Sequence, residues 1–287
     1  MTGGRPESMR ATGRSRDPVT GTTRGPQSES VGLAIMALAA TVFTLIALGV
    51  TSVAFAARLP AVAGLVGWCQ RTAADVPWWV GAAASVSLLS MVIGALVTSW
   101  RHLRARPAKG AAPVAVVRAP ELFAYSMGGR RGQVVVSSGL LGRLDPAERR
   151  VLFAHETAHL RLGHHRLLWA ADIAALNPLL RPLCSRLRFS IERAADEEAV
   201  RAVGDRPLVA KTVGRVALMA FEAAPGPALG MDGGAVVTRV EALLVPAPPA
   251  RPNRAVASGL VVLTLAAALT WVQWPQLSEL ALHLCRI

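Results

Sequence analysis

Residues 145–162 read DPAERRVLFAHETAHLRL, and this stretch carries start and stop signals for one helix. Asp145, Pro146 and Glu148 supply an N-cap, a first-turn proline and a capping-box acid. Gly163 follows directly, at a position where helices commonly end. The segment therefore predicts a well-capped helix that runs to about Leu162.

Within this helix, residues 155–159 read His-Glu-Thr-Ala-His, an HExxH sequence. Positions i and i+4 share one helix face, so the imidazoles of His155 and His159 can reach one ion. We therefore expect one Zn²⁺ per chain, with Glu156 as the general base that takes a proton from the attacking water. The alternative, two stray histidines on a surface helix, is disfavoured by their position inside a capped helix.

A third protein ligand is expected because zinc peptidases usually use three and leave one position open. Glu192 is the candidate, on a helix predicted over residues 186–203, with Asp196 at i+4 on the same face. Asp196 would then accept a hydrogen bond from the free ring nitrogen of a ligand histidine. The alternative makes this segment an ordinary solvated acidic face, which is how we interpret Glu197 and Glu198.

The remaining histidines are not expected to bind the metal. His164 and His165 follow the HExxH helix and are interpreted as surface residues, because Leu162 replaces the glycine that a longer metzincin motif requires. His102 is interpreted as interfacial and His283 as external, so neither can reach the site.

Composition indicates a membrane protein. Of 287 residues, 52% are hydrophobic and 17% are charged, and the mean hydropathy is +0.40. Three uncharged apolar runs, at residues 31–57, 76–100 and 255–274, are each long enough to cross a bilayer as a helix. Tryptophans border the second and third runs, where membrane meets water.

Arginine placement predicts the orientation. The formal net charge is +13, and the basic residues gather before the first run, after the second and before the third. Residues 58–75 carry few charges and are therefore expected outside, whereas residues 101–254 are expected in the cytoplasm. The basic charge is thus interpreted as a topology signal, and no nucleic-acid partner is expected.

The expected cytoplasmic part also contains a β-hairpin within residues 121–138, around a Gly-rich turn. Its second strand is expected to offer an exposed edge for an extended peptide substrate, through Gln133, Val134, Val135, Val136 and Ser137. Residues 167–180 are expected to form a buried or interface-lying helix, and residues 207–222 a further helix capped by Asp205. Arg239 is one candidate for stabilising the oxyanion.

Taken together, these patterns predict a mainly α membrane protein, with three transmembrane helices and a cytoplasmic α+β metallopeptidase domain of helices and a short β-hairpin. In chain order, the expected organisation is a disordered basic tail (1–30), transmembrane helix 1 (31–57), an external loop (58–75), transmembrane helix 2 (76–100), the cytoplasmic zinc metallopeptidase domain (101–254), transmembrane helix 3 (255–274) and an external C-terminal tail (275–287).

As a set, the segment 135–148, the HExxH at 155–159, Glu192 and Asp196 resemble the membrane gluzincins. Two branches are similar over residues 121–245: the BlaR/MecR-type sensor metallopeptidases and the HtpX or CAAX-prenyl-protease type. The resemblance implies a cytoplasm-facing zinc site with endopeptidase activity, a Glu ligand at Glu192 and a supporting acid at Asp196. Only a short tail follows the third run, so we expect no counterpart of the penicillin-binding domain of the sensor branch.

The sequence therefore favours a zinc-dependent endopeptidase in the cell membrane that cleaves a protein or peptide at the cytoplasmic face. Regulatory proteolysis of a repressor and quality control of membrane proteins are the two roles considered. One alternative is a non-catalytic zinc-binding sensor or scaffold, in which Glu156 would have no chemical role. The other is a binder of anionic lipid or nucleic acid.

Three cysteines add one further expectation. Cys69 and Cys285 both fall on the external side in this topology, where a disulfide can form and persist, whereas Cys184 falls on the reducing side. The alternative is two unpaired thiols at the membrane surface.

Overall fold

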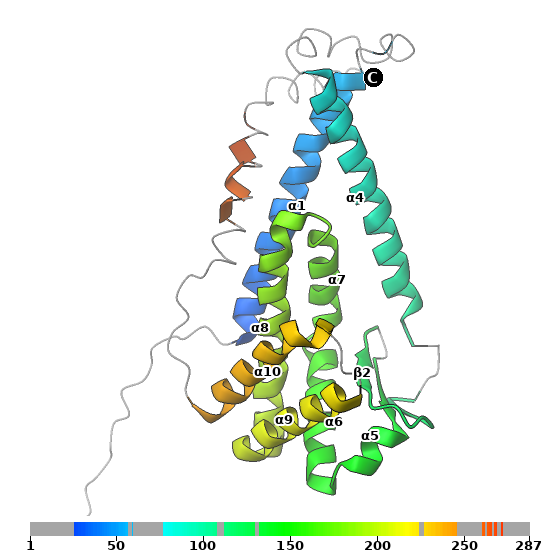
Figure 1. The fold of residues 1–287 in the computed structure, drawn as a ribbon, viewed down its shortest axis with the longest axis vertical. Coiled ribbons are helices and arrows are strands. Elements are labelled where there is room, and N and C mark those ends of the chain that lie inside the picture. Colours follow the sequence, from blue (N-terminus) through cyan, green and yellow to red (C-terminus); the bar gives the residue numbers. More distant parts are fainter. Residues whose placement is uncertain are drawn as a thin grey trace, which may run out of the picture.

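The computed structural model describes residues 26–56, 59, 77–107, 112–129, 132–223 and 227–245, together with single residues between 260 and 271. It is mainly helical with one small sheet, as the sequence predicted (Figure 1). Cys69, Cys285 and His283 lie outside the described residues, as do the other residues of the expected external loop except Leu59.

Two long apolar helices, α1 (Pro26–Ala56) and α4 (Trp78–Arg104), correspond to the first two expected spans. Their mean hydropathy reaches 2.5 and 2.1, so both are long and apolar enough to cross a membrane. Figure 1 shows them extending beyond the other labelled elements. The outward face of α4 is apolar along most of its length, a surface that suits lipid better than water. Its exposed large side chains include Val86, Leu89, Val92, Ile93, Leu96 and Val97.

Helix α1 begins five residues earlier than the expected span, so residues 26–30 are helical and not part of a disordered tail. The first turn is held in place by polar contacts, because Arg186 donates through Nε and Nη2 to one oxygen of Glu29, at 3.0 and 2.5 Å. The third expected span lies mostly outside the described residues. Those of its residues that are described are helical, and Leu263 packs against the core that contains α1.

The sheet has three strands in the order β1-β3-β2. Strands β2 (Ala124–Met127) and β3 (Gln133–Ser137) form the expected antiparallel hairpin, while β1 (Val114–Val117), which was not predicted, pairs in parallel with β3. All five residues of β3 are buried. The expectation that β3 offers an exposed edge is therefore wrong, since the unpredicted β1 occupies its other side.

Helix α5 (Ser138–Arg143) follows the sheet and leads into α6 (Pro146–Arg161), which has the predicted capping box. Asp145 accepts hydrogen bonds from the N–H groups of Ala147 and Glu148, and Glu148 accepts one from the N–H of Asp145. After α6 the helix is interrupted at Gly163, whose φ of 67° is left-handed. Helix α7 (His164–Ala174) begins directly after this break.

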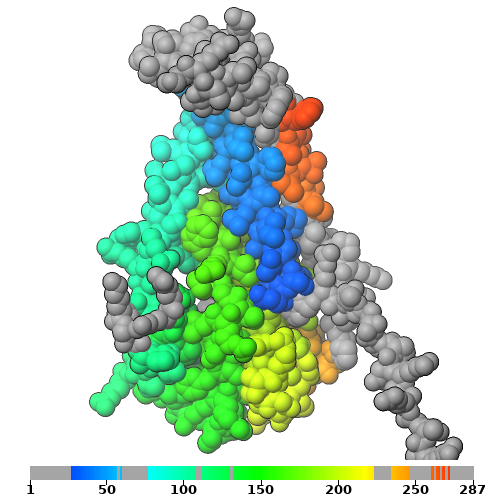
Figure 2. Space-filling model, turned by 180° about the vertical axis from the view of Figure 1, so that it is seen from behind, coloured from blue at the N-terminus to red at the C-terminus, as the bar shows by residue number. Residues whose placement is uncertain are grey.

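A short 3₁₀ turn (Pro178–Leu180) joins α7 to α8 (Arg181–Val203), and this hairpin packs against α1. Figure 2 shows the blue surface of α1 running along the green surface of the hairpin. The shared core is almost wholly apolar and draws on all three helices. Its buried members are Leu33, Ala34, Ala37, Ala40, Ala171, Ala174, Leu180, Leu183, Cys184, Leu187 and Ile191. The expected interface-lying helix is thus α7 with the 3₁₀ turn, seated between α1 and α4 (Figure 1).

Helices α9 (Arg206–Ala223) and α10 (Pro227–Leu244) complete the described fold. Helix α9 begins where Asp205 caps it, as predicted, through a hydrogen bond from the N–H of Leu208. A small apolar core of Val151, Ala199, Val209, Ala210 and Leu243 joins α6, α8, α9 and α10. These four helices are thereby held around the HExxH segment.

Candidate metal centre

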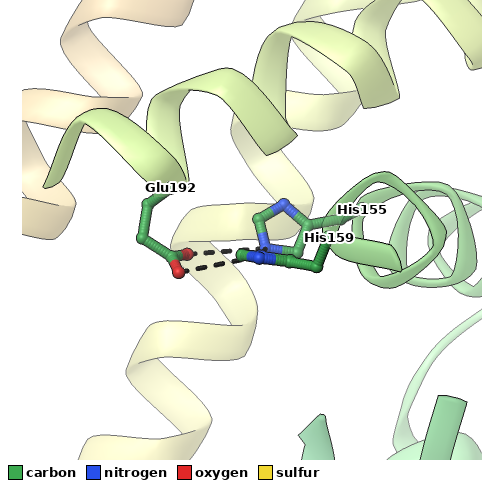
Figure 3. Close-up of side chains that lie close together, drawn as sticks. All are labelled: His155, His159 and Glu192. Carbon is green, nitrogen blue, oxygen red and sulfur yellow. Dashed lines mark hydrogen bonds and ion pairs between the residues drawn. The ribbon is translucent and has the colours of Figure 1, made fainter. Parts of the chain in front are cut away.

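Helices α6 and α8 bring His155, His159 and Glu192 together, with their side chains pointing toward one another (Figure 3). The Nε2 atoms of the two histidines lie 3.1 Å apart. Oxygens of Glu192 lie 3.5 Å from Nε2 of His155 and 3.6 Å from Nε2 of His159. Within the described ranges, this is the group of side chains whose donor atoms are close enough to hold a metal ion.

The donor set fits zinc in both chemistry and spacing. Two imidazole nitrogens and one carboxylate are a common catalytic zinc set. Ligand atoms around a tetrahedral zinc, at about 2.0–2.2 Å from the ion, lie about 3.3–3.6 Å apart, and the three separations here are close to that range. In both histidines the nitrogen concerned is Nε2, so each ring can direct its Nε2 lone pair at the same ion.

The other ring nitrogen of His155 lies against a buried carboxylate. Nδ1 of His155 is 3.0 Å from Oδ1 of Asp196, the residue that the sequence expected to accept its hydrogen bond, and the two atoms form an ion-pair contact without hydrogen-bond geometry. Burial opposes protonation of His155, but interactions with the carboxylates of Asp196 and Glu192 outweigh it and raise its pKa to about 10 in the metal-free protein. The Asp196 contact orients the ring with Nε2 toward the cluster.

Arg239, on α10, holds the carboxylates of Asp196 and Glu192 in place. Its guanidinium donates to the two oxygens of Asp196 at 2.8 Å each, and its Nη1 lies 3.2 Å from Glu192. Burial opposes ionisation of Glu192, yet His155 and Arg239 hold the pKa of its carboxyl well below the usual range. Glu192 is therefore ionised and ready to bind a cation.

His159 is oriented by a residue that the sequence had assigned to the surface. His164 is fully buried, and its Nδ1 lies 3.0 Å from Nδ1 of His159. On its other side, Nε2 of His164 lies 3.2 Å from Oε1 of Gln27, in the first turn of α1. The surface interpretation of His164 is wrong because α1 packs against α7 and covers this residue. The offset of five residues could have indicated that His164 lies near His159, whereas nothing in the sequence indicated a contact with Gln27.

Glu156 lies beside this cluster in a cavity of about 370 Å³. Burial raises the pKa of its carboxyl, and the charge of His155 only partly opposes the effect. The cavity also includes Arg239 and is otherwise mainly apolar. Its aliphatic and aromatic lining residues include Leu122, Phe123, Leu152, Val213, Val216 and Val236. A carboxyl with a raised pKa in such a place is a suitable proton acceptor and donor.

The remaining acids and histidines lie away from the donor group. Glu197 forms an ion pair with Arg206, whereas Glu198 is buried beneath Arg161 and Arg201, so the expectation that Glu198 is solvated is wrong. His165 packs against Gly128, where any added Cβ would collide with its ring. His102, in the last turn of α4, contacts Asp172 of α7 at 2.8 Å.

Comparison with protein families matches residues 96–180 to peptidase family M48. The matched part contains the sheet, α6 with its HExxH, and α7, and it ends before α8, so Glu192 and Asp196 lie beyond it. The match bears out the resemblance to the HtpX or CAAX-protease type, but it does not extend to the BlaR/MecR type. Comparison with curated proteins and with solved structures finds no match.

Proposed function

We propose, from the premise that residues 96–180 belong to peptidase family M48, that this chain is a zinc-dependent endopeptidase embedded in a membrane. It cleaves protein or peptide substrates at the cytoplasmic face. Regulatory proteolysis and quality control of membrane proteins both suit such an enzyme.

The single observation that carries the proposal is the position of Glu156. It projects into the same cavity as His155 and Glu192, yet it is not one of the three donors. A structural zinc site needs ligands only, and it gives no role to a buried carboxyl with a raised pKa beside them. This arrangement favours catalysis over a sensor or scaffold.

Each residue then has a defined task. His155, His159 and Glu192 would hold Zn²⁺, which supplies Lewis-acid polarisation of the scissile carbonyl. Glu156 accepts the proton of the attacking water and later donates it to the leaving amine. Asp196 orients His155, and Arg239 fixes Asp196 and Glu192. Arg239 lines the cavity, so its guanidinium is also available to the developing oxyanion.

Substrate binding is assigned to the cavity and to β2 instead of β3. The chain from Leu122 to Ala124 lines the cavity and leads into β2, the outer strand on the side of α6. An extended peptide that pairs with β2 would place its side chains beside the apolar wall formed by α9. We therefore propose a preference for an apolar side chain next to the scissile bond.

The membrane part of the proposal rests on α1 and α4 and on the arginine distribution. Both helices have spanning length, and the basic last turn of α4, with Arg101 and Arg104, leads directly toward the sheet. That order supports a metal site on the arginine-rich side, which we propose to be cytoplasmic. The third span and an external C-terminus complete the proposed topology.

The test compares the wild-type chain with Glu156→Gln, which removes the base and keeps the donors. Cells that produce each form are analysed by mass spectrometry for new peptide termini, and zinc content is measured on the purified proteins. We expect termini that depend on Glu156, with equal zinc in both forms. Equal cleavage by both forms would contradict the proposed mechanism.

A further inference from the structure

A line of hydrogen bonds connects the metal site to the start of the first apolar helix. It runs from Nδ1 of His159 to Nδ1 of His164 at 3.0 Å, and from Nε2 of His164 to Oε1 of Gln27 at 3.2 Å. The residues come from α6, α7 and α1, which the sequence alone gives no reason to connect.

Counting protons along this line leaves one consistent arrangement. If Nε2 of His159 offers its lone pair to a metal, the proton of that neutral ring is on Nδ1. This Nδ1–H can donate only to a bare Nδ1 of His164, which must then carry its own proton on Nε2. That N–H donates to the amide oxygen of Gln27, which cannot act as a donor. The acceptor at Gln27 therefore stabilises the tautomers that metal binding at His159 requires of both rings.

The end of this line is held firmly. His164 is fully buried, so its ring cannot exchange these partners for water. Two residues beyond Gln27, the ion pair of Glu29 with Arg186 fixes the same turn of α1 to α8. One turn later, Leu33 and Ala34 enter the apolar core shared with α7 and α8.

We propose that Gln27 is a positioning residue of the metal site, and that the first turn of the membrane helix thereby tunes the affinity of the site for zinc. The inference rests on the proposed function, because it takes His159 as a ligand. The two ligand histidines differ in their support: a carboxylate orients His155, whereas a neutral relay of His164 and Gln27 orients His159. Partners of this kind usually contribute about 10- to 100-fold to metal affinity.

The experiment measures Zn²⁺ affinity of the full-length protein in detergent, by competition with a chromogenic chelator, and records the Co²⁺ absorption spectrum. All variants carry Glu156→Gln so that self-cleavage does not interfere. Gln27→Met keeps the length of the side chain but removes the acceptor, and we expect weaker Zn²⁺ binding by about 10-fold or more with an altered Co²⁺ spectrum. Gln27→Glu restores an acceptor and should bind as tightly as the parent.

Two further variants separate the relay from simple docking of α1. Glu29→Gln breaks the ion pair in the same turn but leaves the acceptor, so its Zn²⁺ affinity should stay within about twofold of the parent. In His164→Asn, the side-chain oxygen replaces Nδ1 as acceptor for His159 while the connection to Gln27 is lost. Gln27→Met should then have no additional effect in the His164→Asn background, which is a double-mutant cycle.

The outcomes are distinct. Parent-like affinity and spectrum in Gln27→Met would overturn the positioning role. A loss of Zn²⁺ affinity from Gln27→Met that is equally large with and without His164→Asn would overturn it as well. A loss in Glu29→Gln as large as that in Gln27→Met would assign the effect to helix docking and also overturn the proposal. If the parent itself binds no zinc, or binds it equally well without His155, the proposed metal site fails and not merely the inference.

Discussion

Glu192 and Glu197 lie five residues apart on α8 and have very different surroundings. Glu192 faces the two histidines of α6 and contacts Arg239. Glu197 pairs with Arg206 at the start of α9, outside the metal cavity. Their shared residue type makes them a matched pair for separating ligand loss from loss of surface charge.

We predict that Glu192→Ala lowers zinc content and activity together, because it removes one of three donors and leaves Arg239 with one acidic partner fewer. Glu197→Ala should change stability by no more than about 1 kcal/mol and leave zinc content unchanged, since it breaks an exposed ion pair. Atomic emission on the purified proteins provides the measurement. Unchanged metal in Glu192→Ala would remove Glu192 from the ligand set.

At this scale, sequence reasoning succeeded where the signal was local. The i, i+4 spacing of His155 and His159 is a property of one helix, and the cap signals showed that the helix exists. His164 was misjudged because its burial depends on α1, which lies far away in the sequence. Arg239 was only one candidate for an oxyanion role, because its contact with Asp196 requires the packing of α10.

The helix that carries the HExxH depends on its N-terminal cap. Asp145 satisfies two N–H groups there, and Glu148 satisfies a third. Asp145→Ala should therefore lower the melting temperature by about 2–4 °C, the shift expected for loss of a helix cap in a chain of this size. Asp145→Asn keeps an acceptor at the cap and should melt close to the wild type. Thermal unfolding in detergent provides the comparison, and equal melting of all three proteins would contradict the role of the cap.

Helix α9 is fastened to α6 by Arg215, which donates to both oxygens of the fully buried Glu148 at 2.7 and 2.6 Å. This hydrogen bonding lowers the pKa of Glu148. The resulting stability is present above the unfolded pKa of about 4.3 and is lost as the pH falls through the lower folded value. In Arg215→Met the melting temperature should therefore fall most near pH 7.

The difference between Arg215→Met and the wild type should shrink as the pH falls below the unfolded pKa of about 4.3 and through the lower folded pKa, where Glu148 becomes protonated in the wild type as well. Arg206→Met is the control, since it breaks an exposed ion pair with Glu197 and should show only a small difference across the range. A difference for Arg215→Met that is independent of pH would show that Arg215 acts through packing alone.

Elements were predictable in proportion to how local their signals are. The hairpin of β2 and β3 has its own turn, and α6 and α9 have their own caps, so all four were found. Strand β1 was missed because its pairing with β3 spans the intervening hairpin strand and has no turn of its own. That omission is also why β3 was given an exposed edge. Register and strand order depend on such non-local pairing.

For the whole molecule, the proposed orientation makes a prediction about thiols. Cys184 is fully buried in the core shared by α1, α7 and α8, so it should resist maleimides whichever side it faces. An exposed reporter is therefore needed, and Ala202→Cys, near the end of α8, provides one. An impermeant maleimide on intact cells should reach Cys69 and Cys285 only after reduction, and should reach Ala202→Cys only after permeabilisation.

Two results would contradict parts of this prediction, the disulfide or the orientation. Ready labelling of Cys69 and Cys285 without reductant excludes the disulfide but leaves the orientation intact. Labelling of Ala202→Cys in intact cells reverses the orientation, because α8 carries the proposed ligand Glu192 and would then face outward. Wild-type protein with reactive Cys184 would instead indicate that the core around α1 opens.

The seating of α1 against α7 and α8 also bears on how the protein is made. The ribosome releases α1 first, and the HExxH helix, α8 and α10 emerge only after it. A nascent chain thus holds the outer end of the relay, Gln27, long before it holds any of the residues that the relay orients. On this account the site matures only when the later helices dock onto an α1 that is already inserted in the bilayer. Copies that miss the membrane would then bind zinc more weakly, which would limit stray cleavage of proteins in the cytosol.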